Sequence, residues 1–274
     1  MTKELLFLKP NQRRGSKPRC HWITHGEPSD VASRLTKLIA PHGVVSASDC
    51  WMPKGFVEIA EAELDKATCL LGSQPCEELG SWWLGRPHSK EKTPSFDIAS
   101  TCTVDNKPAL LLVEAKAHEE ELTKESIGKR LPSASTDSRL NHDRIGSCIQ
   151  ESILDMASET HMPWALSRDR NYQMSNRFAW SWKVAQLGRP VILVYLGFLN
   201  AADMTEDGKG GSNVLFDSPN AWRTCVLTHS REIVPPTIWD RRWVCGSQSI
   251  TPLIRSTEIA RDRSIEKFIV HGDE

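Results

Sequence analysis

Residues 96–116 read FDIASTCTV, DNKP and ALLLVEAK in succession, and this stretch decides how the rest of the chain is interpreted. Two apolar, β-favouring runs flank a group of turn-forming residues, which is the pattern of a β-hairpin. If the turn is centred within residues 105–107, antiparallel pairing sets Asp97 opposite Glu114 or Lys116. The sequence therefore predicts that charged side chains converge at the open end of this hairpin.

The alternation of side chains along a strand separates the charged from the apolar residues. Glu114 and Lys116 share one face, whereas Val113 and Ala115 point the other way into apolar packing. Burying two carboxylates and an ammonium, those of Asp97, Glu114 and Lys116, is costly unless they pair or hold a metal. Two carboxylates suit Mg²⁺, and a neighbouring lysine can orient or deprotonate an attacking water. The pattern thus indicates metal-assisted chemistry on a phosphate, against the alternative of a surface hairpin with an ordinary ion pair.

Asp97, followed after sixteen residues by Glu114-Ala115-Lys116, resembles the active-site signature of the PD-(D/E)XK nuclease superfamily, whose members share the restriction endonuclease-like fold. The proline of the signature stands three residues before Asp97 rather than next to it, so the first half is degenerate. The resemblance covers residues 60–200. It implies catalysis through Asp97, Glu114 and Lys116, and an Mg²⁺ or Mn²⁺ ion held by Asp97, Glu114 and the carbonyl of Ala115.

The resemblance also implies a substrate and an assembly. The substrate is nucleic acid, with DNA favoured over RNA. A homodimer is compatible with it, because double-strand cutting by this fold commonly needs two active sites. Three alternatives belong to other classes: a non-catalytic nucleic-acid-binding or assembly module that retains the fold, a hydrolase of another phosphate ester, and a protein whose tryptophans line a small-molecule pocket.

Charge and length bound the organisation of the chain. Of its 274 residues, 34 are Lys or Arg and 35 are Asp or Glu, so nucleic-acid affinity must come from a local patch. Residues 1–28 are expected to form a basic N-terminal arm, either a contact for nucleic acid or a solvated, partly disordered segment. Residues 29–200 are expected to form the nuclease-like core domain. Residues 201–274 are expected to be a C-terminal extension packed on that core.

The cysteines and the hydropathy pattern indicate the cellular compartment of the protein. Eight cysteines are scattered without any CxxC pair, which indicates reduced thiols rather than a disulfide framework. We find neither a basic-then-apolar leader nor a run of about eighteen apolar residues. The sequence therefore predicts a cytoplasmic protein without a membrane span.

Apolar periodicity predicts the remaining elements. Helical spacing occurs at about 30–40, 57–71, 75–84, 141–159 and 171–187. Residues 191–196 form a continuously apolar run, which predicts a strand buried on both faces of a helix-covered sheet. With the hairpin, this order agrees with the αβββαβ core of the resembling superfamily, one strand of which is not placed. The expected fold is therefore α/β, with a central mixed sheet flanked by helices.

Two helices carry further candidate residues. Glu78, or its neighbour Glu77, could supply an additional acid on the metal side, or both could simply satisfy a helix N-terminus. Gln173, Arg177 and Trp180 form a second stripe on the 171–187 helix, with groups that suit phosphate, sugar and base contacts. The alternative for this stripe is an ordinary solvated face.

Overall fold

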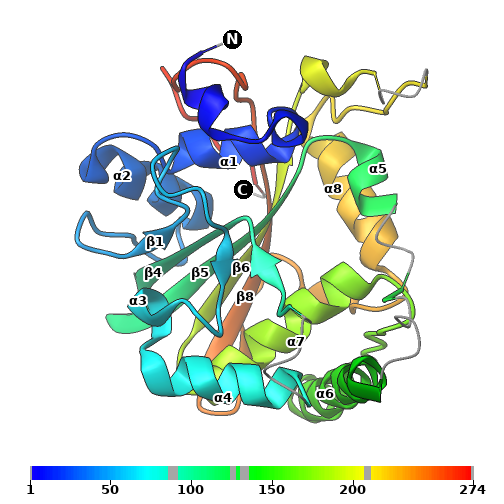
Figure 1. The fold of residues 1–274 in the computed structure, drawn as a ribbon. Helices are drawn as coiled ribbons and strands as arrows, with labels where there is room; N and C mark the ends of the chain where they lie inside the picture. Colours follow the sequence, from blue (N-terminus) through cyan, green and yellow to red (C-terminus); the bar gives the residue numbers. More distant parts are fainter. Residues whose placement is uncertain (1, 86–91, 124–127, 130–135, 207–210, 273–274) are drawn as a thin grey trace.

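A six-stranded mixed sheet lies at the centre of the computed structural model (Figure 1). The structure describes residues 2–85, 92–123, 128–129, 136–206 and 211–272. The sheet order is β1-β4-β5-β6-β8-β7, with β4 and β5 antiparallel and β5, β6 and β8 parallel. The strands are β1 (Trp51–Met52), β4 (Ile98–Val104), β5 (Lys107–Lys116), β6 (Val191–Phe198), β7 (Trp243–Cys245) and β8 (Gln248–Thr257).

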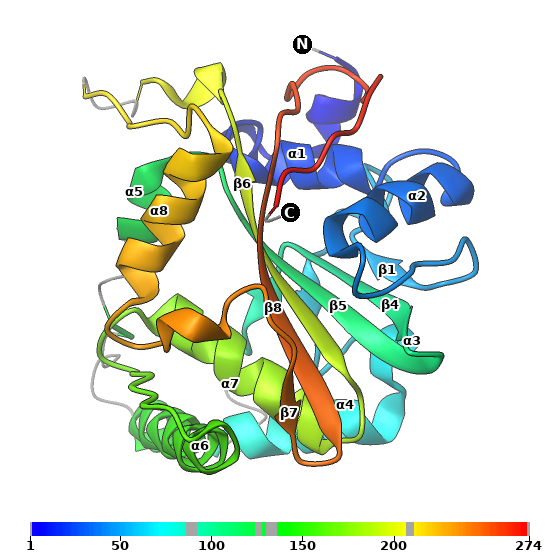
Figure 2. The same ribbon diagram turned by 180° about the vertical axis from the view of Figure 1, so that it is seen from behind.

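Helices cover both faces of this sheet, and Figures 1 and 2 show the sheet between the two layers. One face packs against α1 and α2, and the other against α4, α6, α7 and α8. The predicted α/β fold with a central mixed sheet flanked by helices is confirmed. The helices are α1 (Ser16–Ile23), α2 (Pro28–Ile39), α3 (Thr68–Leu71), α4 (Ser73–Trp83), α5 (Glu119–Thr123), α6 (Thr136–Thr160), α7 (Tyr172–Gln186) and α8 (Pro219–Ser230), with 3-10 turns η1 (Glu4–Phe7), η2 (Pro10–Gln12), η4 (Ala202–Met204) and η5 (Pro236–Ile238).

The hairpin predicted from the deciding stretch is strands β4 and β5. Asp105 and Asn106 form its turn with φ angles of 48° and 61°, the left-handed conformation that a two-residue hairpin turn requires. Short polar side chains such as these tolerate that conformation better than most residues. Ile98 consequently pairs with Val113, which is the register expected for a turn centred on Asp105-Asn106.

Strand β6 is the buried strand that the apolar run predicts. All eight of its residues are buried, because β5 and β8 pair with its two edges and helices cover both faces. Residues 201–274, expected to pack on the core as an extension, supply β8 to this sheet. Strand β8 pairs with β6 along the whole of β6, so this part of the chain belongs to the central sheet.

The N-terminal residues also differ from the expected arm. Within residues 1–28, the described residues form η1, η2 and α1 before α2 begins. Leu5 and Leu8 are each only 1% exposed and join the apolar cluster under α1 and α2. Burying two leucine side chains holds the segment against the core, so it does not extend into solvent.

The helix predicted at 57–71 is wrong. Only residues 68–71 are helical, as α3, and β2 (Ala62–Glu63) precedes them. Strand β2 pairs with β3 (Ser95–Phe96) in a separate two-stranded sheet. The alternation of alanine and glutamate at 60–63 is a period of two, which favours a strand over the helix that wider spacing suggested.

Candidate active site

Asp97 and Glu114 lie opposite each other at the end of the hairpin. Asp97 occupies the bend between β3 and β4, where one further step of the β4–β5 register places it beside Glu114. The half-buried Asp97 accepts a 2.8 Å hydrogen bond at Oδ2 from the backbone N–H of Ala115. This bond fixes the carboxylate against the end of β5, as the hairpin register predicts.

Glu114 is the centre of a buried hydrogen-bond network, and its residue is only 1% exposed. Its Oε1 accepts from Lys116 Nζ at 2.7 Å and from Gln173 Nε2 at 2.6 Å. Its Oε2 accepts from Arg177 Nε at 2.6 Å. Lys116 Nζ also donates to Gln173 Oε1 at 3.1 Å, so the lysine and the amide hold each other in place.

Helix α7 brings Gln173 and Arg177 to Glu114, because residues four apart lie on one helix face. Arg177 is buried and also donates from Nη2 to the Ser95 carbonyl at 2.7 Å. Its guanidinium lies over the Phe96 ring, 4.6 Å from the centroid. The second stripe on this helix is therefore neither a solvated face nor, at Arg177, available to a phosphate backbone. Gln173 and Arg177 instead bond Glu114, and Trp180 is buried against Trp82 and Trp83.

The environments of the two carboxylates push their pKa values apart. Burial raises the pKa of Asp97 well above its ordinary value, and the negative charge of Glu114 adds to this. Burial also opposes ionisation of Glu114, but the charges of Arg177 and then Lys116 outweigh it and lower its pKa. Glu114 is consequently the more readily ionised member of the pair, and a further cation would favour the ionised form of Asp97 most.

Glu61 is a third carboxylate at this site, and the sequence analysis missed it. Strand β2 pairs with β3 so that Ala62 faces Phe96, and one further step sets Glu61 beside Asp97. The negative charge of Glu61 contributes to the raised pKa of Asp97. Its Oε2 accepts from Ser95 Oγ at 2.9 Å. The period-two alternation around Glu61 is the signal that could have found it.

Glu78 does not occupy this position. It is exposed on α4, where its Oε1 accepts a 3.0 Å hydrogen bond from Gln74 Nε2 within the same helix. Glu77 is also exposed. The acid that accompanies Asp97 is therefore Glu61, which directly precedes β2, and not a residue of α4.

Two histidines flank the lysine of the site. His118 is buried, with Nε2 3.6 Å from Glu121 Oε1. At the end of α8, burial and then the charge of Lys116 lower the pKa of His229 to about 4. His229 is therefore neutral at physiological pH, and part of the lowering of its pKa comes from the positive charge of Lys116.

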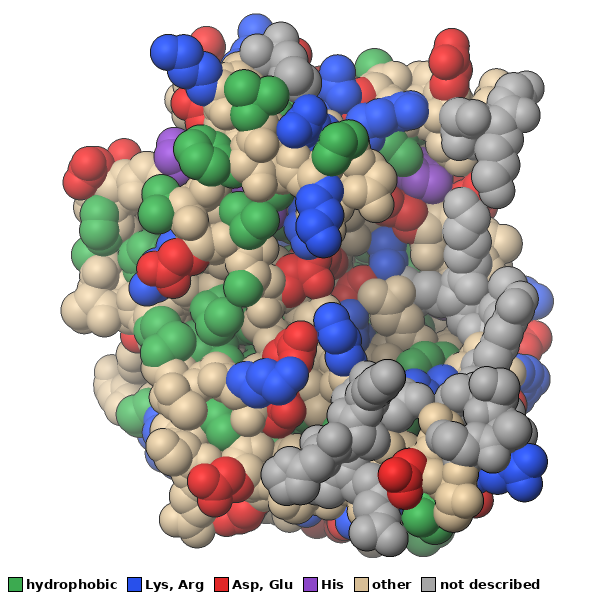
Figure 3. Space-filling view, viewed as in Figure 1, with side chains coloured by type: hydrophobic (Ala, Val, Ile, Leu, Met, Phe, Trp, Pro, Cys, Tyr) green, Lys and Arg blue, Asp and Glu red, His purple; other side chains and the backbone are tan. Residues whose placement is uncertain are grey.

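The site lies in a hollow on the face that Figure 1 presents. Figure 3 shows acidic side chains at the middle of this face, over β3 and the end of β5, with Lys and Arg side chains around them. The site contains as many positively charged side chains as carboxylates, before any metal is counted. The acids are Asp97, Glu114 and Glu61, and the bases are Lys116, Arg177 and Lys17, which pairs with Glu61 at 2.7 Å.

Within the described ranges, no group of three or more His, Cys, Asp or Glu residues is arranged to hold a metal ion. Of the three carboxylates at the site, Glu61 pairs with Lys17, so the oxygen donors left for a metal are the opposed Asp97 and Glu114, together with backbone carbonyls. This falls short of a closed protein cage, but Mg²⁺ usually keeps several waters and needs only one or two carboxylates.

Among the residues that the structure describes, none of the helices has both the length and the apolar character needed to cross a bilayer.

The comparisons with known proteins leave the family of this chain open. Comparison of the chain with known proteins finds no matching family model, no matching curated protein and no matching solved structure.

Proposed function

We propose that the chain is a divalent-metal-dependent nuclease that hydrolyses phosphodiester bonds in nucleic acid. One observation carries the proposal: Asp97 and Glu114 lie opposite each other, with Lys116 on the same strand face as Glu114 and bonded to it. An acidic pair with a lysine two residues on is what the PD-(D/E)XK signature requires. An antiparallel hairpin whose second strand pairs in parallel with the strand after α7 also supports a restriction endonuclease-like core.

The donor chemistry fits Mg²⁺ or Mn²⁺. Asp97, Glu114 and the carbonyl of Ala115 would hold the ion, with waters and a substrate phosphate completing its oxygen ligands. The raised pKa of Asp97 supports this, because a bound cation would offset the negative charge that Glu114 imposes on it. When bound, the ion would polarise the phosphate and make a water more acidic.

Lys116 and Gln173 supply the rest of the chemistry from the chain itself. The carboxylate of Glu114 and the amide oxygen of Gln173 fix the ammonium of Lys116 at 2.7 and 3.1 Å. From this fixed position the positive charge can offset charge that develops on the phosphate, or orient the attacking water. Gln173 acts here as a positioning residue, because it bonds both Lys116 and Glu114.

DNA is the proposed substrate in preference to RNA, and a homodimer is the proposed form for cutting both strands. The balanced net charge of the chain gives no general attraction to nucleic acid. The Lys and Arg side chains around the acidic hollow in Figure 3 are the local patch that would contact the phosphate backbone.

The test is a cleavage assay on single- and double-stranded DNA and RNA with Mg²⁺, Mn²⁺ or chelator. We expect metal-dependent cleavage that falls at least about a hundredfold in Asp97→Asn and Lys116→Met. Glu78→Gln, which changes an exposed carboxylate outside the site, should retain the wild-type rate. If the wild-type protein cuts none of these polymers with either metal, or if Asp97→Asn cuts normally, the nuclease proposal fails.

A second candidate function is a non-catalytic module that retains this fold, and one observation favours it. Both oxygens of Glu114 already accept hydrogen bonds from the chain, and Arg177 supplies a cation where a metal would otherwise act. If the chain is such a non-catalytic module, Mg²⁺ does not stabilise the wild-type protein against unfolding. A metal-binding nuclease instead gains about 2.7 kcal/mol when the ion is at a hundred times its Kd. Thermal unfolding with increasing Mg²⁺ separates the two functions before any substrate is chosen.

A further inference from the structure

A cavity of about 450 Å³ lies between α5 and α8, next to the end of β5 that carries Lys116. Figures 1 and 2 show these two helices side by side, and the helices contact each other. Two residues after Lys116, His118 forms an antiparallel bridge with Leu215, which lines the cavity. Two residues span about 7 Å of extended chain. The cavity therefore adjoins the candidate active site.

Helix α8 gives a second link between the cavity and Lys116. His229 lines the cavity, and the charge of Lys116 contributes to the lowering of its pKa. The backbone carbonyl of His229 accepts a 3.0 Å hydrogen bond from Asn171 Nδ2, at the start of α7. The same helix carries Gln173, which bonds Lys116. The continuation of β5 and the end of α8 thus hold the cavity against the same lysine.

The buried part of the cavity lining is apolar and well packed. Leu122 and Phe216 line the cavity and are only 1% and 2% exposed. The Phe216 ring packs edge to face against Trp222, with ring centroids 4.7 Å apart. A preformed apolar cavity of this volume lies in the range of small-molecule sites, and its aromatic ring suits a flat ligand.

Polar groups lie on the exposed part of the lining. They are the hydroxyls of Thr224 and Thr228 on α8 and the carboxylate of Glu119 on α5. The backbone N–H of Glu119 donates to the Val214 carbonyl at 2.9 Å, which fixes the position of this residue. Burial and then the negative charge of Glu119 raise the pKa of Cys225, in the same lining, to about 11. The cavity therefore combines an apolar interior with a carboxylate at its edge.

We propose that this cavity takes an unpaired guanine base of the nucleic-acid substrate, beside the phosphate that Lys116 contacts; this rests on the proposed nuclease function, which supplies that phosphate. The apolar lining suits the faces of a base, and the polar groups suit its edge. The two oxygens of a carboxylate match the adjacent N1–H and N2–H donors of guanine. Adenine presents an acceptor at N1, which a carboxylate cannot satisfy.

The proposal specifies the form of the substrate. A base enclosed between α5 and α8 cannot pair with a second strand, so the bound strand is single at this position. A duplex would have to extrude the base, at a cost of a few kcal/mol. Single-stranded DNA with a guanine at the site is therefore the preferred ligand.

Fluorescence anisotropy of the full chain with labelled oligothymidine octamers tests this assignment. Each octamer carries one central guanine, adenine or abasic position, and chelator is present so that no strand is cut. We expect the guanine strand to bind about tenfold more tightly than the other two. Glu119→Gln should abolish this preference. Glu78→Gln makes the same charge change at an exposed residue on α4 and should keep it.

Filling the cavity gives a second variant. Thr224 is exposed, so Thr224→Trp can place an indole in the cavity without replacing a buried side chain. We expect this variant to unfold at the wild-type urea concentration and to bind the three octamers equally. A guanine preference that persists in Thr224→Trp would place the base outside the cavity and overturn the proposal.

The remaining outcomes separate this proposal from the nuclease proposal. Equal binding of the three octamers by the wild-type protein, or equal effects of Glu119→Gln and Glu78→Gln, overturns the base assignment. Cleavage with Mg²⁺ is measured separately. Cleavage without a guanine preference leaves the nuclease proposal standing and removes this one. A guanine preference that depends on Glu119, without cleavage, supports the base cavity and removes the nuclease proposal.

Discussion

At the residue scale, the two opposed carboxylates of the site make opposite contributions to stability. Asp97 has a raised pKa because burial and the charge of Glu114 both disfavour its ionised form. Glu114 has a lowered pKa because Arg177 and Lys116 outweigh the cost of burying it. Paired carboxylates whose pKa values are pushed apart are a common feature of sites that carry out acid-base chemistry.

Asp97→Asn should therefore stabilise the protein at neutral pH. With a raised pKa, folded Asp97 binds more protons than the unfolded chain, so stability falls as pH rises from the ordinary value of 3.8 through the folded pKa. Asparagine keeps an oxygen for the Ala115 N–H and carries no charge. We expect a gain of about 0.5–2 kcal/mol at neutral pH and a flatter pH profile, measured by urea unfolding.

Glu114→Gln is the matched comparison, with the opposite sign. The lowered pKa of Glu114 gives stability that is present above the ordinary value of 4.5 and is lost as pH falls through the folded pKa. Removing the charge also leaves Arg177 and Lys116 buried without their carboxylate, which costs about 3–5 kcal/mol. Equal destabilisation by Asp97→Asn and Glu114→Gln would contradict this division of roles.

At the element scale, local patterns predicted the hairpin, β6 and four of the five expected helices, because each is long or has a strong turn signal. Strand β2 has only two residues and pairs with β3 more than thirty residues later, so its local pattern was weak. Because strand β2 was not predicted, Glu61 next to it was not recognised as a candidate site residue. Helix α7 shows a different limit: spacing placed Gln173 and Arg177 on one face, but only the tertiary fold decides that this face meets Glu114.

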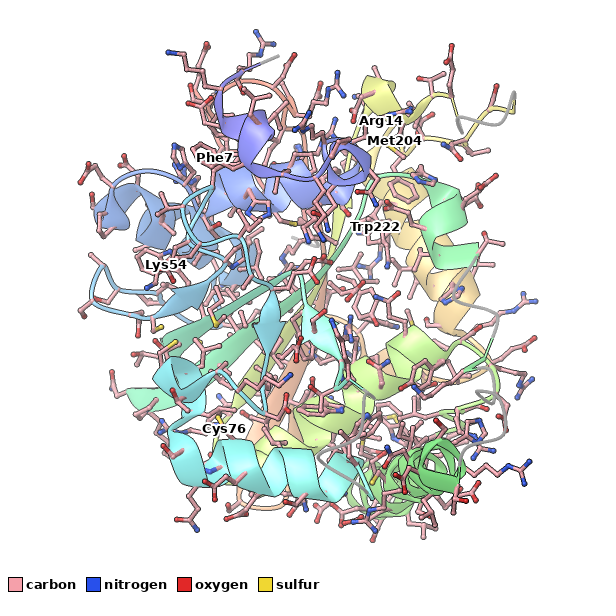
Figure 4. The ribbon with its side chains drawn as sticks, viewed as in Figure 1. Phe7, Arg14, Lys54, Cys76, Met204 and Trp222 are labelled. Atoms are coloured by element: carbon pink, nitrogen blue, oxygen red, sulfur yellow. The ribbon has the colours of Figure 1, made fainter. Side chains whose placement is uncertain are left out.

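The packing of α8 against strand β6 requires glycine at position 197, beside the site. Gly197 pairs with Lys116, and a Cβ at Gly197 would lie 2.5 Å from the Trp222 ring. Figure 4 shows Trp222 on α8. Its indole N–H donates to the Tyr195 carbonyl at 3.3 Å, so the ring has little freedom to move away. Gly197→Ala should destabilise the protein by roughly 1–3 kcal/mol in urea unfolding.

Gly80→Ala is the control, because it adds the same methyl group inside helix α4. Its Cβ would meet Asp65 at an ordinary contact distance of 3.4 Å. Alanine favours the helix over glycine by about 1 kcal/mol, so this change should be neutral or stabilising. A neutral Gly197→Ala variant would mean that Trp222 does not hold α8 closely against β6.

At the scale of the whole molecule, the two ends of the chain pack together. Arg19 Nε donates to the Ile259 carbonyl at 2.9 Å, and Trp22 Nε1 donates to the Arg261 carbonyl at 2.7 Å. Figure 4 also shows Arg14 beside Met204. These contacts join positions up to 240 residues apart, which no local pattern reveals. The segments expected to be an arm and an extension are instead parts of one structural unit.

Two neighbouring leucines test whether the N-terminal segment is part of this unit. Leu8 is 1% exposed in the cluster under α1 and α2, whereas Leu6 is 56% exposed. Leu8→Ala should cost roughly 2–5 kcal/mol through lost burial and the cavity it leaves. Leu6→Ala should change stability by no more than about 0.5 kcal/mol.

Urea unfolding of both leucine variants measures this difference. A solvated arm predicts that neither change alters stability, whereas a packed segment predicts a loss only for Leu8→Ala. The outcome also bears on the site, because α1 carries Lys17, whose ammonium is 2.7 Å from Glu61 Oε1. If Leu8→Ala unfolds at the wild-type urea concentration, the N-terminal segment does not hold α1 in place. The ion pair that restrains Glu61 beside Asp97 would then lack this support.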